Sequence, residues 1–269
     1  MRRILWAIVA TALAGCQTVQ TTQPGAVGIE RRQSMLLSSA EVDASASNAY
    51  QQLIAGESKK GKVNEHPEQT ARVRGIAHRL IAQTRVFRAD APGWRWEVNV
   101  ISTGEVNAFC MPGGKIAVYG GMLDKLKPSD DELAAVMGHE IAHALREHGR
   151  ERLSQAAAQD IALEILQKRG VIRRTGTDRA QLLLALTLNL PNSREHETEA
   201  DRIGVELAAR AGYDPRAAIT LWEKMGKLGG GQPPEFLSTH PSHETRIADL
   251  RVYAARVMPL YEEARARPR

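Results

Sequence analysis

The chain has 269 residues, of which 43% are hydrophobic and 25% charged, so it can form one sizeable globular domain. Aromatic residues make up only 4%, which predicts an aliphatic, alanine-rich and mostly helical core. The 36 Lys and Arg residues exceed the 31 Asp and Glu residues by only five, and Arg2 and Arg3 supply two of those charges. So small an excess is no footprint of nucleic-acid binding, and no nucleic-acid partner is expected.

The first residues are typical of an exported protein. Two arginines precede the apolar stretch Ile4–Ala14, which is too short to cross a bilayer and suits the centre of a signal peptide. Leu13-Ala14-Gly15-Cys16 resembles the bacterial lipobox, in which the signal is cleaved before a cysteine that receives lipid. The open alternative is an ordinary signal peptide with an incidental cysteine. Gln17, in place of Asp after the cysteine, resembles lipoproteins sorted to the outer membrane.

This pattern predicts a signal peptide over residues 1–15, lipidation of Cys16 and attachment to a membrane facing the periplasm. After cleavage Cys110 is the one other cysteine, so no internal disulfide is expected. Residues 16–46, which are rich in small and polar side chains, are interpreted as a tether.

The remaining chain is divided into a domain over residues 47–258 and a basic tail over 259–269. Hydrophobic spacing predicts a helix that places Val73, Ile76 and Leu80 on one face, and a capping box at Ser129 predicts a long helix. Further helices are expected at 179–190, 193–211, 214–225 and 240–257, and strands at 94–101 and 115–119. The prediction is an α+β fold that is mostly α, with a small sheet.

Two histidines four residues apart, in the stretch Gly138-His139-Glu140-Ile141-Ala142-His143, form the clearest chemical motif. Residues i and i+4 share a helix face, so both imidazoles can bind one metal ion. Glu140 lies about 100° round the helix, where it can accept a proton from water activated by the metal. The alternative is a solvated polar turn, but the preceding residues are apolar and unpaired buried imidazoles would be costly. Gly138, a poor helix former, suggests that another backbone approaches closely.

A zinc hydrolase site needs a third protein ligand, and the segment Ser193–Gly204 offers one on a second helix. Glu197 and Asp201 are four residues apart and share a face. If Glu197 binds the metal, Asp201 can accept the N–H of a ligating histidine. Glu199 is expected to point elsewhere, as the solvated partner of an arginine, and His196 stays open as an alternative ligand.

The H-E-x-x-H motif followed by E-x-E-A-D-x-x-G resembles a family of gluzincin metallopeptidases. The family includes HtpX, the CAAX prenyl endopeptidases and the periplasmic proteases BepA and LoiP. The stretches Asn107–Leu123 and Ser238–Ile247 are similar to two further family motifs, N-A-F-x-x-P-G-G and S-T-H-P-x-x-x-x-R-I. The resemblance covers about residues 60–255 and implies a zincin-like domain with a long active-site helix. The lipobox makes the chain most similar to the LoiP- and BepA-like members.

The resemblance also implies residue roles. His139, His143 and Glu197 are expected to bind one Zn²⁺ per chain, with Glu140 as the general base. The strand Lys115–Tyr119, which follows a turn at Pro112-Gly113-Gly114, is expected to be an edge strand that pairs with substrate backbone. Its substrate-binding residues are Gly113, Gly114, Lys115, Ile116, Ala117 and Val118. Cys110 is interpreted as a buried structural thiol, with a zinc-ligand or redox role as the alternative.

His240 and Arg246 each have more than one reading. In related periplasmic members, the histidine of the H-P motif can occupy the fourth position of the metal and hold the enzyme latent. The competing reading is that His240 stabilises the oxyanion of the reaction, and the third is a helix start without a metal role. Arg246 is expected either to stabilise the same oxyanion or to brace the loop.

The sequence therefore predicts a zinc-dependent endopeptidase of the bacterial periplasm, lipid-anchored at Cys16, for protein quality control. By analogy with the family, its substrates are expected to be unfolded or misassembled envelope proteins. The alternative is a non-proteolytic, zinc-stabilised chaperone or assembly factor for outer-membrane proteins, against which the presence of Glu140 argues. A hydrolase of cell-wall peptides would keep the chemistry and change the substrate.

Overall fold

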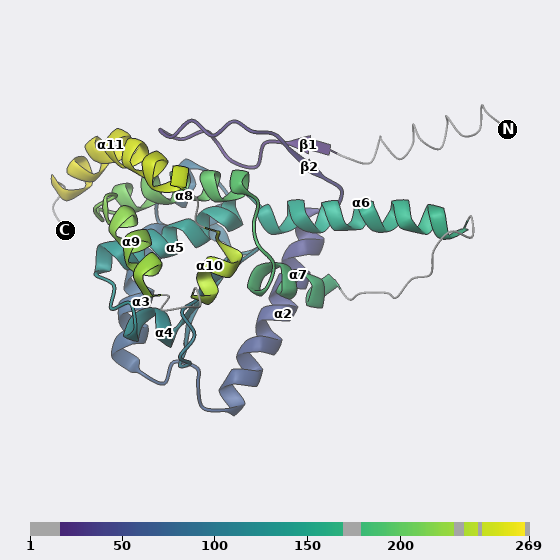
Figure 1. Cartoon of the computed structure of the whole chain (residues 1–269), viewed down its shortest axis with the longest axis horizontal. Helices are drawn as coiled ribbons and strands as arrows, with labels where there is room; N and C mark the ends of the chain where they lie inside the picture. The colour runs from purple at the N-terminus through teal and green to yellow at the C-terminus, as the bar shows by residue number, and fades with distance from the viewer. Residues whose placement is uncertain (1–16, 169–178, 229–233, 242–243, 267–269) are drawn as a thin grey trace.

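The computed structural model describes residues 17–168, 179–228, 234–241 and 244–266 (Figure 1). Helices dominate this part of the chain and accompany two small sheets, so the expected α+β, mostly helical class is confirmed. The lipobox and Cys16 lie outside the described residues, as does the expected helix break at 173–178. Among the described helices, none combines the length and the apolar character needed to span a bilayer.

Helix α5 (Asp130–Leu145) runs through the middle of the domain (Figure 1). Every residue from Glu132 to Leu145 is buried. The side chain of Ser129 accepts a hydrogen bond from the backbone of Glu132, and the Glu132 carboxylate accepts one from Ser129 N–H, which is the predicted capping box. Helix α5 is surrounded by α3 (Pro67–Ile81), α8 (Arg194–Arg210) and α9 (Ala217–Leu228). Helix α11 (Glu244–Ala266) packs on α8.

Helices α5 and α8 cross with their backbones in contact. A Cβ atom on Gly138 would lie 2.9 Å from the carbonyl oxygen of Gly204, and one on Gly204 would lie 2.8 Å from the amide nitrogen of His139. Both distances are too short for a side chain, so the predicted close approach at Gly138 is confirmed. The crossing brings the buried polar residues of both helices together.

The three-stranded sheet has the order β3 (Glu97–Ile101), β5 (Lys115–Tyr119), β4 (Ala108–Met111). β5 runs parallel to β3 and antiparallel to β4, with which it forms a hairpin. The expectation that residues 113–118 form an edge strand is therefore wrong. Gly113 and Gly114, at φ +75° and +82°, form the turn, and β5 is the central strand. β4 is an outer strand that the sequence did not reveal, because its four residues are all buried and show no alternation.

The segment expected to be a tether is largely ordered. Strands β1 (Gln17–Val19) and β2 (Gln33–Met35) pair antiparallel, and α2 (Ser39–Lys59) begins before residue 46. Gln33 is fully buried and donates to the backbone carbonyl of Arg146 at the end of α5.

The expected tail is also mostly structured, since α11 continues to Ala266. The remaining elements are α4 (Gly120–Asp124), α6 (His148–Lys168), α7 (Arg179–Leu188), α10 (Glu235–Thr239) and two 3₁₀ turns (Thr84–Val86, Ala91–Gly93).

The helix crossing can be tested with Gly204→Ala. We expect the substitution to lower the free energy of unfolding by about 1–3 kcal/mol, because the added methyl group meets the α5 backbone. The matched control is Gly75→Ala in α3, where an added methyl group meets nothing within 4 Å. That variant should gain about 0.5–1 kcal/mol from helix propensity. Urea unfolding measures both, and equal stabilities would contradict the close crossing.

Candidate metal centre

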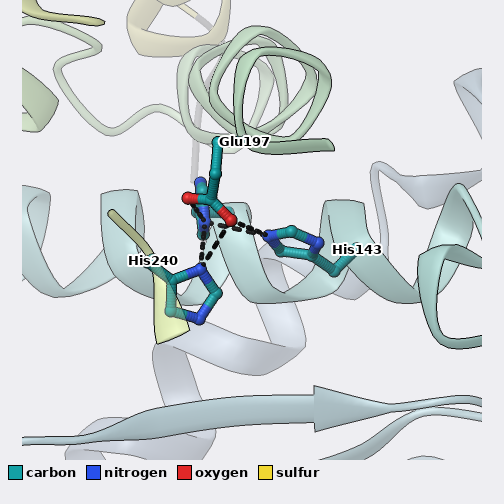
Figure 2. A group of neighbouring side chains, drawn as sticks. His143, Glu197 and His240 are labelled. Carbon is teal, nitrogen blue, oxygen red and sulfur yellow. Dashed lines mark hydrogen bonds and ion pairs between the residues drawn. The ribbon is translucent and has the colours of Figure 1, made fainter. Parts of the chain in front are cut away.

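Four buried side chains from three helical segments converge on one point. His139 and His143 come from α5, Glu197 from α8, and His240 follows α10. One ligand atom from each lies within 4.8 Å of the others. Figure 2 shows the side chains of His143, Glu197 and His240 pointing toward one another. Nε2 of His139 lies 3.0 Å from Nε2 of His143 and 3.1 Å from Nδ1 of His240. This group could hold one metal ion.

The donor set fits zinc. Three imidazole nitrogens and one carboxylate oxygen are ligands that zinc prefers, in the number of its usual tetrahedral coordination. Asp201 Oδ1 lies 2.9 Å from Nδ1 of His139, and because a carboxylate accepts, the proton sits on Nδ1 and Nε2 is left as a metal ligand. Burial lowers the pKa of His139, but hydrogen bonds to Asp201 and Glu197 outweigh it and raise the pKa to about 9. The same two carboxylates attract a metal cation.

Arg246 pairs with the carboxylates of the site. Its Nη1 lies 2.8 Å from Oε2 of Glu197 and its Nε donates to Oδ2 of Asp201 at 2.5 Å. Its guanidinium also lies over the ring of Trp222, 3.6 Å from the ring centroid. Burial would raise the pKa values of Glu197 and Asp201, but the nearby cationic groups keep both lowered. Arg246 also donates from Nη1 to the backbone carbonyl of Pro241 at 3.3 Å, so of its two sequence-based roles the geometry favours bracing the loop.

Glu140 lies beside the group without belonging to it. Its side chain is buried, and burial raises the pKa of its carboxyl group. Oε1 of Glu140 accepts no hydrogen bond from the described residues and lies 3.4 Å from Nε2 of His240. A carboxylate with a free acceptor oxygen at the edge of a metal site is suited to accept a proton from water.

His240 approaches the metal-binding group closely. Its Nδ1 lies 3.0 Å from Oε1 of Glu197, and its ring stacks on Phe236 with centroids 4.3 Å apart. It therefore stands as a fourth donor beside His139, His143 and Glu197.

The space at the site is small. A cavity of about 40 Å³ is bounded by Cys110 of β4, by Glu140 and by the segment after α7. That volume accommodates about one water molecule and no peptide. Arg152 of α6 closes it by donating to the side-chain oxygen of Asn192 and to the carbonyl of Leu186, while Asn192 N–H donates to the carbonyl of Thr239. No motif in the sequence predicted this cover.

Glu199 lies outside the metal group and pairs with arginines, as expected, but the expectation that it is solvated is wrong. This side chain is 4% exposed, and its carboxylate accepts hydrogen bonds from Arg31 and Arg146 and contacts His148. The sequence does not predict the burial of Glu199, because its arginine partners come from distant segments. His196 is not part of the metal group, since its Nε2 lies 3.1 Å from Glu151 and its ring stacks on His148.

Cys110 is also outside the group of four ligands. Its thiol is buried, and burial raises its pKa well above the usual value, which keeps it protonated. A buried, protonated thiol is chemically inert, as a structural role requires.

This buried His/His/Glu group with an adjacent glutamate defines a metallopeptidase type of site, and comparison with known proteins agrees. Residues 67–254 match Peptidase family M48, so the chain belongs to this family of zinc-dependent metallopeptidases. It is 43% identical to "Mitochondrial metalloendopeptidase OMA1" of Arabidopsis thaliana over 177 residues, 65% of this chain and 35% of that protein.

Two further relatives have similar coverage. OMA1 of Schizosaccharomyces pombe is 36% identical over 211 residues, 76% of this chain and 58% of that protein. "Beta-barrel assembly-enhancing protease" of Escherichia coli K12 is 32% identical over 171 residues, 60% of this chain and 35% of that protein. The chain thus spans about a third to three fifths of the length of these relatives.

The bracing role of Arg246 can be tested with Arg246→Met. The substitution leaves two buried carboxylates without their cation, and we expect it to lower the free energy of unfolding of the zinc-free protein by about 3–5 kcal/mol. Arg251→Met is the control on the same helix, because Arg251 forms only an exposed pair with Glu223. Its effect should stay below about 1 kcal/mol. Similar losses in denaturant titrations of both variants would refute the bracing role.

Proposed function

We propose that this chain is a zinc endopeptidase of the bacterial envelope that cleaves unfolded or misassembled proteins. The observation that carries the proposal is the meeting of His139, His143 and Glu197 with Glu140 beside them. Membership of family M48 and the endopeptidase names of the relatives support the reaction type.

Each site residue has a defined task in this reaction. Zinc supplies Lewis acidity, which lowers the pKa of water and stabilises negative charge on oxygen. Glu140 accepts the proton of the attacking water and returns it to the leaving amine. Asp201 holds His139 in the tautomer that leaves Nε2 free, and Arg246 holds both carboxylates in place.

Strand β4 is the candidate for seating a substrate. The carbonyl of Asn107 accepts from the N–H of Tyr119, and Phe109 pairs with Ala117, so the alternation of an antiparallel pair turns the backbone of Cys110 away from β5. Cys110 lines the cavity at the metal group. An extended peptide that adds to β4 would pass the site, and main-chain pairing of this kind selects unfolded chains more than particular sequences.

The envelope location and the lipid anchor rest on the N-terminal sequence. The relatives include mitochondrial and Escherichia coli proteins, so their names do not identify the cellular compartment of this chain. Lipid on Cys16 would be followed at once by strand β1, which starts at Gln17. The anchor would then hold the domain close to the membrane surface.

We further propose that His240 keeps the enzyme latent. Its nitrogen atoms face Glu197 and Glu140 at 3.0 and 3.4 Å, and the cavity beside it has no room for a peptide. Cleavage would require His240 and the cover formed by Asn192 and Thr239 to move.

The test compares the full-length protein in detergent with Glu140→Gln, using unfolded casein as substrate and measuring zinc per chain. We expect about one zinc in both proteins and a loss of roughly 10²–10⁴-fold in cleavage rate for Glu140→Gln, because only the proton acceptor is removed. Equal cleavage by both would contradict the role of Glu140. Zinc binding without cleavage by either points to latency or to a non-proteolytic chaperone.

A second variant separates those two accounts. His240→Ala should cleave casein faster than the wild type if His240 holds the site closed, while its zinc content stays near one per chain. The double variant Glu140→Gln/His240→Ala should be inactive and serves as the control for contaminating proteases. If His240→Ala binds zinc and still leaves casein intact, the chaperone account is favoured.

A further inference from the structure

His148, the first residue of α6, contacts a metal-binding histidine from outside the site. Its Nδ1 lies 2.9 Å from Nδ1 of His143, and its Nε2 lies 3.0 Å from Oε2 of Glu199. The side chain is 1% exposed. It thus bridges a buried carboxylate and an imidazole of the metal group, and the reaction proposed above does not use it.

The hydrogen bonds fix where the protons lie. The Glu199 carboxylate can only accept, so the proton between it and His148 is carried by Nε2 of His148. Nε2 of His143 faces Nε2 of His139 in the metal group, and as a ligand it must be unprotonated. His143 then carries its proton on Nδ1 and donates it to Nδ1 of His148. Each step leaves one donor facing one acceptor.

Glu199 is held firmly enough for this task. Nε of Arg146 donates to Oε2 at 2.9 Å, and the Arg146 side chain is fully buried. Nε of Arg31 donates to Oε1 at 2.6 Å. The two guanidinium groups pair with the Glu199 carboxylate and fix its orientation. Arg31 belongs to the segment between β1 and β2, so the N-terminal segment also contributes to this support.

A backbone turn places His148 over His143. Five residues along a helix would put the two side chains on different faces, but α5 ends at Leu145 and Glu147 adopts a left-handed conformation with φ +51°. The Glu147 carboxylate accepts hydrogen bonds from Arg88 at 2.6 Å and Arg150 at 2.5 Å, which hold this unusual turn. Helix α6 then begins with His148.

We propose that Glu199 and His148 are positioning residues for the metal: they hold His143 in the tautomer and orientation that offer Nε2 to zinc. His143 thereby receives through His148 the support that His139 receives directly from Asp201. The proposal deepens the proposed function and rests on it, since it assigns the residues that orient a ligand of the same zinc site.

The test measures zinc affinity by competition with a chromophoric chelator in the full-length protein. His148→Phe keeps a planar ring in the stack with His196 but removes both nitrogens, and we expect zinc binding to weaken roughly 10–100-fold. His148→Gln retains one acceptor and one donor and should recover most of the affinity. His196→Phe is the matched control, because His196 stacks on His148 and bonds Glu151 without touching a ligand. It should bind zinc as the wild type does.

Two results would overturn the proposal: wild-type zinc affinity in His148→Phe, or an equal loss in His196→Phe. The affinity is read without substrate, so it stands apart from the casein assay. If no variant of the casein assay cleaves, His240→Ala included, the endopeptidase fails, and the zinc affinities still test the positioning pair.

A measurement on the wild-type protein tests the proposal without depending on whether a variant folds. In the zinc-loaded protein labelled with ¹⁵N-histidine, two-bond ¹H–¹⁵N correlations should show His148 with its proton on Nε2 and His143 with its proton on Nδ1. A proton on Nδ1 of His148 would refute the proposal, because Nδ1 could then no longer accept from His143.

Discussion

The contact between the backbones of α5 and α8 is the constraint on which the site depends. At Gly138 and Gly204 no side chain separates the helices, which therefore cross closely. His143 follows Gly138 by five residues and Glu197 precedes Gly204 by seven, so both lie within about two turns of the contact. Their side chains can meet because the helix axes are so near. A larger residue at either glycine would push apart ligands that come from different helices.

The close crossing forces many charged groups into a dry interior, and their pairing follows a pattern. α8 supplies the acids Glu197, Glu199 and Asp201, all buried. Arginines from outside the helix pair neutralise them: Arg246 contacts Glu197 and Asp201, while Arg31 contacts Glu199. A buried carboxylate without such a partner would be costly, so the two outer segments, together with Arg146 at the end of α5, support the acids of the site. This explains why residues near the N-terminus are packed against the domain.

The sequence predicted the parts of the site that depend on local spacing. The i, i+4 relation identified His139 with His143 and Glu197 with Asp201, because helix geometry alone sets which residues share a face. It could not identify His148, which reaches His143 only through the left-handed turn at Glu147. Nor could it identify the N-terminal support, since Arg31 resembles any solvated arginine until its partners are known.

The strand order was missed for a related reason. A fully buried strand shows no alternation of apolar and polar residues, so β4 left no periodic signal. Of the two strands that flank the turn at Gly113 and Gly114, the sequence predicted only β5. The Pro-Gly-Gly turn was visible, but the sequence did not show that strands lie on both sides of it. Pairing partners are set by contacts between segments, which spacing within one segment does not report.

The residues of the site also differ in how firmly the fold holds them. His139, His143 and Glu197 stand on long helices within the main core, whereas His240 follows α10, a helix of five residues. α10 is fixed by the buried ring of Phe236 and by the bond from Asn192 to the carbonyl of Thr239. A short segment held by few contacts opens at lower free energy than a core helix. The donor proposed to act as the latch therefore follows a short segment, whereas the other three donors stand on core helices, and this difference agrees with the proposal.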